Sequence, residues 1–151
     1  MNNFSIILDT SSPRFLKEIQ AGGNILCDFH IRIDQQPFPS DPWLDLPVIV
    51  LTWWLKGYLE LIKTNVPVEN DLMNGPFLFV SRLAGDKVTL TFWQRTVVDK
   101  IEMGSADTTL HEYRTELVRA AEHLLNELDR HSVSSPDISN LRRVLNSIPM
   151  L

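Results

Sequence analysis

The residue types best suited to catalysis lie close together in sequence at Cys27, Asp28 and His30. A Cys–His pair can supply a nucleophile and its general base. From position 24 to 34, however, apolar residues alternate with polar ones, and this pattern predicts a β-strand with one buried and one wet face. Because successive side chains of a strand point to opposite faces, Cys27 is separated from His30. We therefore predict no Cys–His couple and interpret Cys27 as a small core residue.

A second motif, His111-Glu112, begins like the zinc-binding sequence H-E-x-x-H. Position 115 is a threonine, so the second zinc ligand is missing. We interpret both residues as part of the polar face of a helix. The sequence thus predicts no metal site and no cofactor.

A long buried helix is predicted at residues 45–64, the longest apolar block of the chain. Its apolar residues recur at steps of three and four, at Val48, Leu51, Leu55, Leu59 and Ile62. Asp45 is expected to cap the first turn, and Pro47 is tolerated there. Trp53 and Trp54 widen the apolar surface, so both are predicted to be core residues.

The other elements are predicted from alternation, turn residues and helix caps. Strands are expected at residues 4–8, 24–34, 77–83 and 87–95, with a further strand at 96–103 after a bend. Residues 35–43 are expected to be an extended connection, and residues 66–76 a loop. Helices are expected at 14–20, ending at Gly22 and Gly23, at 110–131, with Thr109 and Glu112 at capping-box spacing, and after Ser135-Pro136.

Antiparallel strands with segregated helices predict an α+β fold. We expect an antiparallel sheet of about four to five strands, packed against the long buried helix and a second amphipathic helix, with a short C-terminal helix. The chain of 151 residues fits a single domain, residues 1–151.

Composition narrows the function classes. The formal net charge is −5, which disfavours direct binding of nucleic acid and favours a basic protein partner. A single cysteine permits no internal disulfide, and the first residues lack a basic region, so we expect a cytoplasmic protein without a signal peptide. The apolar block is too short and interrupted to span a membrane.

Trp93 is the clearest candidate for a binding residue. Its neighbours on the same strand face are Thr91 and Arg95, and Trp and Arg are common anchors of protein interfaces. Two interpretations are open: the face is exposed and binds a partner, or another helix covers it.

The order of elements over residues 25–128 resembles the small immunity proteins of bacterial toxin systems, including those of contact-dependent growth inhibition. The resemblance lies in the alternating strand, the helix W-L-D-L-P-V-I-V-L-T-W-W-L, the hairpin F-L-F-V-S-R-L-A-G-D-K-V-T-L-T-F-W and the amphipathic helix. It implies a non-catalytic cytoplasmic protein that occludes the active site or the substrate-binding surface of a cognate toxin. These families share no universal motif, so no family residue is carried over onto this chain.

The predicted partner-binding residues are the outward strand positions Asp28, His30, Arg32, Thr91 and Trp93, together with the loop acids Glu69 and Asp71. An acidic inhibitor can imitate the phosphates of a nuclease substrate and occupy a basic cleft. On this hypothesis, charge reversal at Glu69 and Asp71 weakens partner binding without lowering the melting temperature.

Two other classes of protein are open, and the chain is expected to be a monomer or a homodimer. The first alternative is a chaperone or adaptor for a secreted effector. The other alternative, ranked after the chaperone, is a small enzyme in which distant residues converge, for example Asp28, His30 and His111. A deep pocket with perturbed pKa values favours an enzyme, whereas a flat sheet face favours a binding protein.

Overall fold

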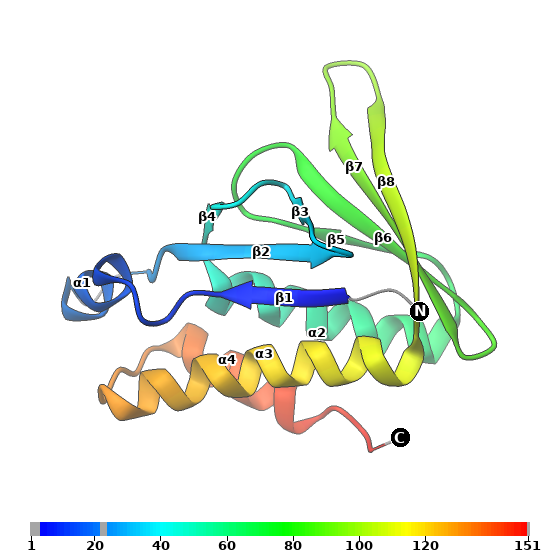
Figure 1. The fold of residues 1–151 in the computed structure, drawn as a ribbon. Coiled ribbons are helices and arrows are strands. Elements are labelled where there is room, and N and C mark those ends of the chain that lie inside the picture. The colour runs from blue at the N-terminus through cyan, green and yellow to red at the C-terminus, as the bar shows by residue number, and fades with distance from the viewer. Residues whose placement is uncertain (1–3, 22–23, 151) are drawn as a thin grey trace.

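In the computed structural model, the described residues, 4–21 and 24–150, form four helices and two antiparallel sheets of four strands each (Figure 1). The predicted α+β fold with antiparallel pairing and a short C-terminal helix is confirmed. The strands are more numerous than expected and divide between two sheets. Additional strands lie at Gln36–Phe38, in the predicted connection, and at Val68–Asp71, in the predicted loop. Another lies at Leu44–Asp45, where the long helix was predicted to begin.

The first sheet is built around β2 (Cys27–Ile33). β1 (Phe4–Leu8) and β3 (Gln36–Phe38) pair with β2 on opposite edges, and the two-residue β4 (Leu44–Asp45) also pairs with β2. Asp34 and Gln35, both with positive φ, form the tight turn from β2 to β3. Two consecutive positive φ values give a turn whose twist matches that of the flanking strands.

The second sheet contains β5 (Val68–Asp71), β6 (Phe77–Ala84), β7 (Lys87–Arg95) and β8 (Lys100–Thr109), in that order. Gly85 has the positive φ expected for the β6–β7 turn. β7 and β8 continue past the rest of the sheet as a projecting hairpin (Figure 1). β8 is longer than expected and leads directly into a helix.

The helices are α1 (Pro13–Ala21), α2 (Pro47–Thr64), α3 (Leu110–Arg130) and α4 (Pro136–Asn146). The predicted cap of α3 is present: Thr109 Oγ1 accepts from the Glu112 N–H at 3.0 Å. α4 begins after Ser135 as predicted, and there Ser135 Oγ accepts from the Ile138 N–H at 3.2 Å. The predicted stop at Gly22 and Gly23 lies outside the described residues. Among the described helices, none has the length and apolar character needed to cross a membrane.

Asp45 does not cap α2, contrary to the prediction. The N-cap residue is Leu46, which makes no side-chain cap. The Asp45 carboxylate is fully buried and accepts hydrogen bonds from the Trp43 indole and from the backbone N–H groups of Leu46, Met73 and Asn74. It therefore ties the turn before β6 to the start of α2.

Trp54 on α2 joins the two sheets through the core. Its ring stacks on Phe29 of β2, with centroids 5.1 Å apart, and meets Phe79 of β6 edge-on at 5.0 Å. One hydrophobic cluster contains buried residues from both sheets and from all four helices. The neighbouring Trp53 was predicted to be core, but this is wrong: its exposed fraction is 39%. Successive helix positions differ by about 100° in direction, so the two indoles point to different sides.

Gly57 marks a close approach between α2 and β5. A Cβ at this position would lie 2.6 Å from Asn70 Oδ1 and 3.1 Å from Val68 Cγ1. The buried Asn70 side chain cannot easily turn away, because its Nδ2 donates to Val68 O, Phe79 O and Ser81 Oγ. We expect Gly57→Ala to lower the free energy of unfolding by about 1–2 kcal/mol, because overpacking outweighs the gain in helix propensity.

Urea unfolding of the variant measures this change. Gly104→Ala is the matched control, because a Cβ at Gly104 meets nothing within 4 Å. Its effect should stay within about 0.5 kcal/mol. Equal stability of Gly57→Ala and the wild type would contradict the close packing of α2 on β5.

Candidate functional site

The predicted binding residues fall into two groups on different sheets. Asp28, His30 and Arg32 lie on β2 of the first sheet. Glu69, Asp71, Thr91 and Trp93 lie on β5 and β7 of the second sheet. The two groups differ in exposure and in their contacts, and they are described in turn.

The strand register brings the second group onto one face. Glu69 pairs with Val80, which pairs with Thr91, and Asp71 pairs with Leu78, which pairs with Trp93. This is the outer face of the sheet, since Val88, Leu90 and Phe92 point to the core from the opposite face. The sequence analysis placed Glu69 and Asp71 in a loop. In the structure they lie on β5, which pairs with β6, and β6 in turn pairs with β7, the strand of Trp93.

The acids of the outer face are paired with bases from the same face. Arg95 reaches Asp71 at 3.1 Å and Glu69 at 3.6 Å, and Lys100 Nζ lies 3.9 Å from Glu69. Two carboxylates thus face two cations, so these residues carry no net charge. The four side chains are about half exposed, and such ion pairs contribute little to stability.

Trp93 is half-buried, and Lys100 Nζ lies 4.7 Å from its ring centroid. A cation over an indole face is held by the ring quadrupole. Its cross-strand neighbour Leu78 is fully buried, although it lies outside the central hydrophobic cluster. Trp93 therefore covers apolar surface below it and keeps part of its ring open to solvent.

The end of the β7–β8 hairpin exposes apolar side chains that sequence reasoning missed. Val97 and Val98 are 103% and 93% exposed, and Ile101 and Met103 are more than half exposed. The turn is held by hydrogen bonds between Thr96 and Asp99, so the two valines point outward from an ordered turn. The only signal in the sequence is a pair of valines where a polar turn is usual.

Met103 also lines a hollow of about 340 Å³ between β3 and β8. Pro37, Phe38 and Phe92 contribute apolar walls to this hollow. The apolar surface of the hairpin therefore continues toward the first sheet.

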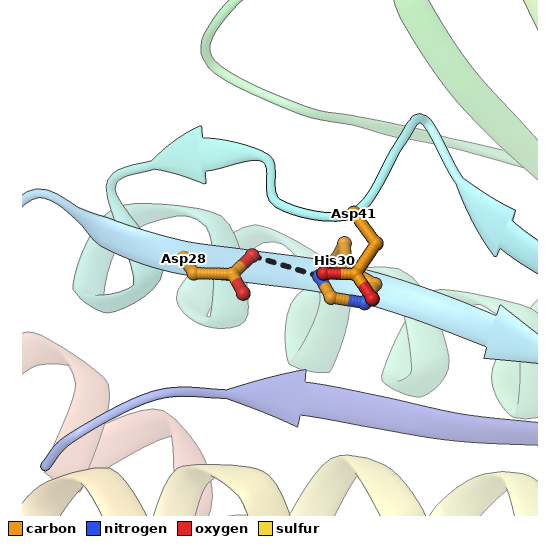
Figure 2. A group of neighbouring side chains, drawn as sticks. All are labelled: Asp28, His30 and Asp41. Carbon is orange, nitrogen blue, oxygen red and sulfur yellow. Dashed lines mark hydrogen bonds and ion pairs between the residues drawn. The ribbon is translucent and has the colours of Figure 1, made fainter. Parts of the chain in front are cut away.

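The first group forms a compact cluster with Asp41, a residue of the connection between β3 and β4. His30 Nδ1 is 2.8 Å from Asp28 Oδ1 (Figure 2). An Arg32 terminal nitrogen is 2.7 Å from Asp41 Oδ2. His30 points away from the core, as predicted, yet it is only 1% exposed. It is therefore not an accessible binding residue, which corrects the expectation of an outward, wet position.

The connection covers His30 because it is fastened to β2 at Trp43. The Trp43 N–H donates to Asp28 Oδ1 at 2.9 Å, and its carbonyl accepts from the Phe29 N–H at 2.7 Å. Sequence alternation describes the strand itself and carries no information on which segment folds over it.

Of the three residues proposed for an enzyme, Asp28 and His30 are in contact, but His111 lies in a different environment. His111 is exposed at the first turn of α3, whereas His30 is buried under the connection. Cys27 is fully buried as predicted, and burial, reinforced by the carboxylates of Asp28, Asp9 and Asp45, raises the pKa of its thiol to about 12. A thiol in this state is a poor nucleophile.

Comparison with protein-family models, curated proteins and solved structures finds no match to this chain. The function is therefore argued from the surfaces themselves.

Proposed function

We propose that this chain is a non-catalytic binding protein: an immunity protein that neutralises a cognate bacterial toxin in the cytoplasm by occluding its active site or substrate surface. The observation that supports the proposal is a surface that we call the binding face. It consists of the outer-face residues Glu69, Asp71, Thr91 and Trp93 and the exposed valines of the hairpin turn, Val97 and Val98. Ile101 pairs with Gln94 and lies on the opposite face of the hairpin.

The binding face has the composition of a protein interface. Contiguous exposed apolar side chains on a folded domain mark interaction sites, and aromatic residues and arginine dominate their energetics. Here apolar side chains project at the hairpin end, and a half-buried tryptophan with paired charges lies farther along the same strand. A partner with an apolar recess and a polar rim fits this arrangement.

The net charge of the chain acts on an approaching partner at longer range than the contacts of the binding face do. Because Glu69 and Asp71 are neutralised by Arg95 and Lys100, they do not form an isolated acidic patch. The net charge of −5 of the whole chain still attracts a basic toxin domain and raises the association rate. On this proposal the net charge raises the rate of association, whereas Trp93 and the hairpin stabilise the bound complex.

The test is capture of the partner from the source cells by the tagged chain, followed by a high-salt wash. We expect one stoichiometric polypeptide with a toxic domain, and at least about a tenfold weaker affinity for the double variant Val97→Ser/Val98→Ser, since burying one valine contributes about 1.5 kcal/mol or more. The melting temperature should not change, because both valines are exposed.

Val66→Ser is the matched control, since Val66 is 58% exposed and lies outside the binding face. It should bind the partner like the wild type. Equal affinity of the double variant and this control would remove the hairpin from the interface. Recovery of a mixture of secreted effectors would instead favour the chaperone, the second candidate.

A further inference from the structure

β8 is an edge strand whose outer side is open. Among the described residues, β8 pairs with β7 alone, and β7 pairs on its other side with β6. Residues 100–103 are all exposed and lie where the hairpin projects past the rest of the sheet (Figure 1). An edge strand presents a row of unpaired backbone N–H and C=O groups, to which another strand can pair. β8 contains no proline that would prevent such pairing.

Two hydrogen bonds at the ends of the β7–β8 ladder show which backbone groups of β8 point away from β7. The Leu110 N–H donates to the Asp86 carbonyl, and the Thr96 N–H donates to the Asp99 carbonyl, both at 2.6 Å. In an antiparallel ladder, hydrogen-bonded pairs alternate with pairs whose backbone groups point outward. Followed inward from both ends, this alternation gives outward backbone groups to Lys100, Glu102, Ser105 and Asp107.

A β-bulge makes the spacing of these outward groups irregular. The register shifts next to Phe92, where Met103 is the extra residue of β8. Glu102 and Ser105 are therefore three positions apart instead of the usual two. A regular strand that pairs with Glu102 is out of step at Ser105. A second, antiparallel copy of β8 has the same step at the same place, so it stays in register across the bulge.

We propose that two copies of this chain pair through antiparallel β8 strands around a twofold axis, with Glu102 of each copy opposite Ser105 of the other. The same register places Lys100 of each copy opposite Asp107 of the other. All four residues have outward backbone groups, so each pair exchanges two hydrogen bonds. The four-stranded sheets of the two copies then join into one continuous sheet, through an interface that is identical on both sides.

The charges on the outer face of β8 are complementary in this register. Lys100 pairs with Arg95 and Asp107 pairs with Thr89, which places both on the same face of the sheet as Trp93. Opposite charges directly across a strand pair stabilise it, and like charges destabilise it. The twofold axis produces the contact between Lys100 and Asp107 twice.

The opposite face of β8 is complementary in size. Ile101 and Met103 are 55% and 52% exposed. The register places Ile101 opposite Ala106 of the second copy, and Met103 opposite Gly104, so each large side chain meets a small residue. A Cβ at Gly104 would meet nothing within 4 Å, and the hollow beside it has an apolar wall at Phe38. Pairing therefore covers the two apolar side chains that the single chain leaves exposed.

Sedimentation equilibrium of the full chain over a series of concentrations tests the pairing, and we expect a dimer that dissociates on dilution. Lys100→Glu and Asp107→Lys should each weaken the dimer about tenfold, because each variant puts two like-charge pairs across the axis. The double variant Lys100→Glu/Asp107→Lys should regain the wild-type dissociation constant, because opposite charges face each other again. Lys63→Glu, at an exposed position of α2, is the matched control and should dimerise like the wild type.

Ser105→Pro tests the backbone pairing. It removes an N–H that points away from β7, so the dimer should weaken at least about tenfold while the circular dichroism of the fold is unchanged. A chain that stays monomeric at every concentration would overturn the proposal. A double charge variant no tighter than the single variants would also overturn it, because Lys100 and Asp107 would then not face each other. None of these measurements involves a toxin, so their outcome is independent of the proposed function.

Discussion

Replacing Trp54 by alanine lowers the free energy of unfolding by about 3–5 kcal/mol, the range for deleting a large aromatic side chain from a packed core. Trp54 is fully buried and contacts Phe29 of one sheet and Phe79 of the other, so its removal leaves a cavity between the two sheets. Its indole Nε1 also donates to the Asp71 carbonyl at 2.8 Å. Loss of this bond loosens β5, which carries two residues of the binding face.

Trp53→Ala is the matched control in the same helix. Its side chain is 39% exposed, so its change should stay below about 1 kcal/mol. Chemical unfolding of both variants measures the difference, and Trp54→Phe should lie between them because it keeps a ring but loses the indole donor. Equal losses at Trp53 and Trp54 would contradict the assignment of Trp54 as the link between the sheets.

Replacing Asp45 by alanine is expected to cost about 3–5 kcal/mol, similar to removing one member of a buried charged interaction. The carboxylate is fully buried, and its removal leaves four donors without an acceptor. Each buried donor left unpaired costs about 1–3 kcal/mol, although water entering the gap recovers part of this. The turn at Met73 and Asn74 should separate from the start of α2.

Asp129→Ala is the control for this variant. Asp129 is 55% exposed and pairs with Arg142 on the surface, so its loss should change stability by less than about 1 kcal/mol. Hydrogen exchange at the Met73 and Asn74 amides gives the local readout, and we expect faster exchange only in the Asp45 variant. Unchanged exchange there would show that the carboxylate does not hold the turn.

Periodicity predicted the elements that have one buried face. The alternation around Cys27 predicted β2, that of Val88, Leu90 and Phe92 predicted β7, and the helical repeat from Val48 predicted α2. Burial of one face imposes these periods, so they are visible in a single sequence.

Elements held by their partners were not predicted. β5 reads V-E-N-D, a segment without apolar alternation, and it forms a strand because β6 supplies its hydrogen bonds. β3 and β4 are too short and too close to prolines to show a period. In each case pairing across the chain overrides weak local preference.

The candidate site was predicted in part. The common face of Thr91 and Trp93 follows from the period of β7, and the structure adds Glu69 and Asp71 to it. The internal neutralisation of the acids by Arg95 and Lys100 depends on the strand order, which sequence alone does not give. The cover over His30 likewise depends on a tertiary contact, made by Trp43.

The most direct test of toxin neutralisation is an inhibition titration with the captured partner. The purified toxic domain is assayed for its own activity while the chain is added in increasing amounts. An immunity protein should abolish the activity at one equivalent, and Val97→Ser/Val98→Ser should require a clear excess. Full activity of the partner in the presence of excess wild-type chain would contradict the proposed function.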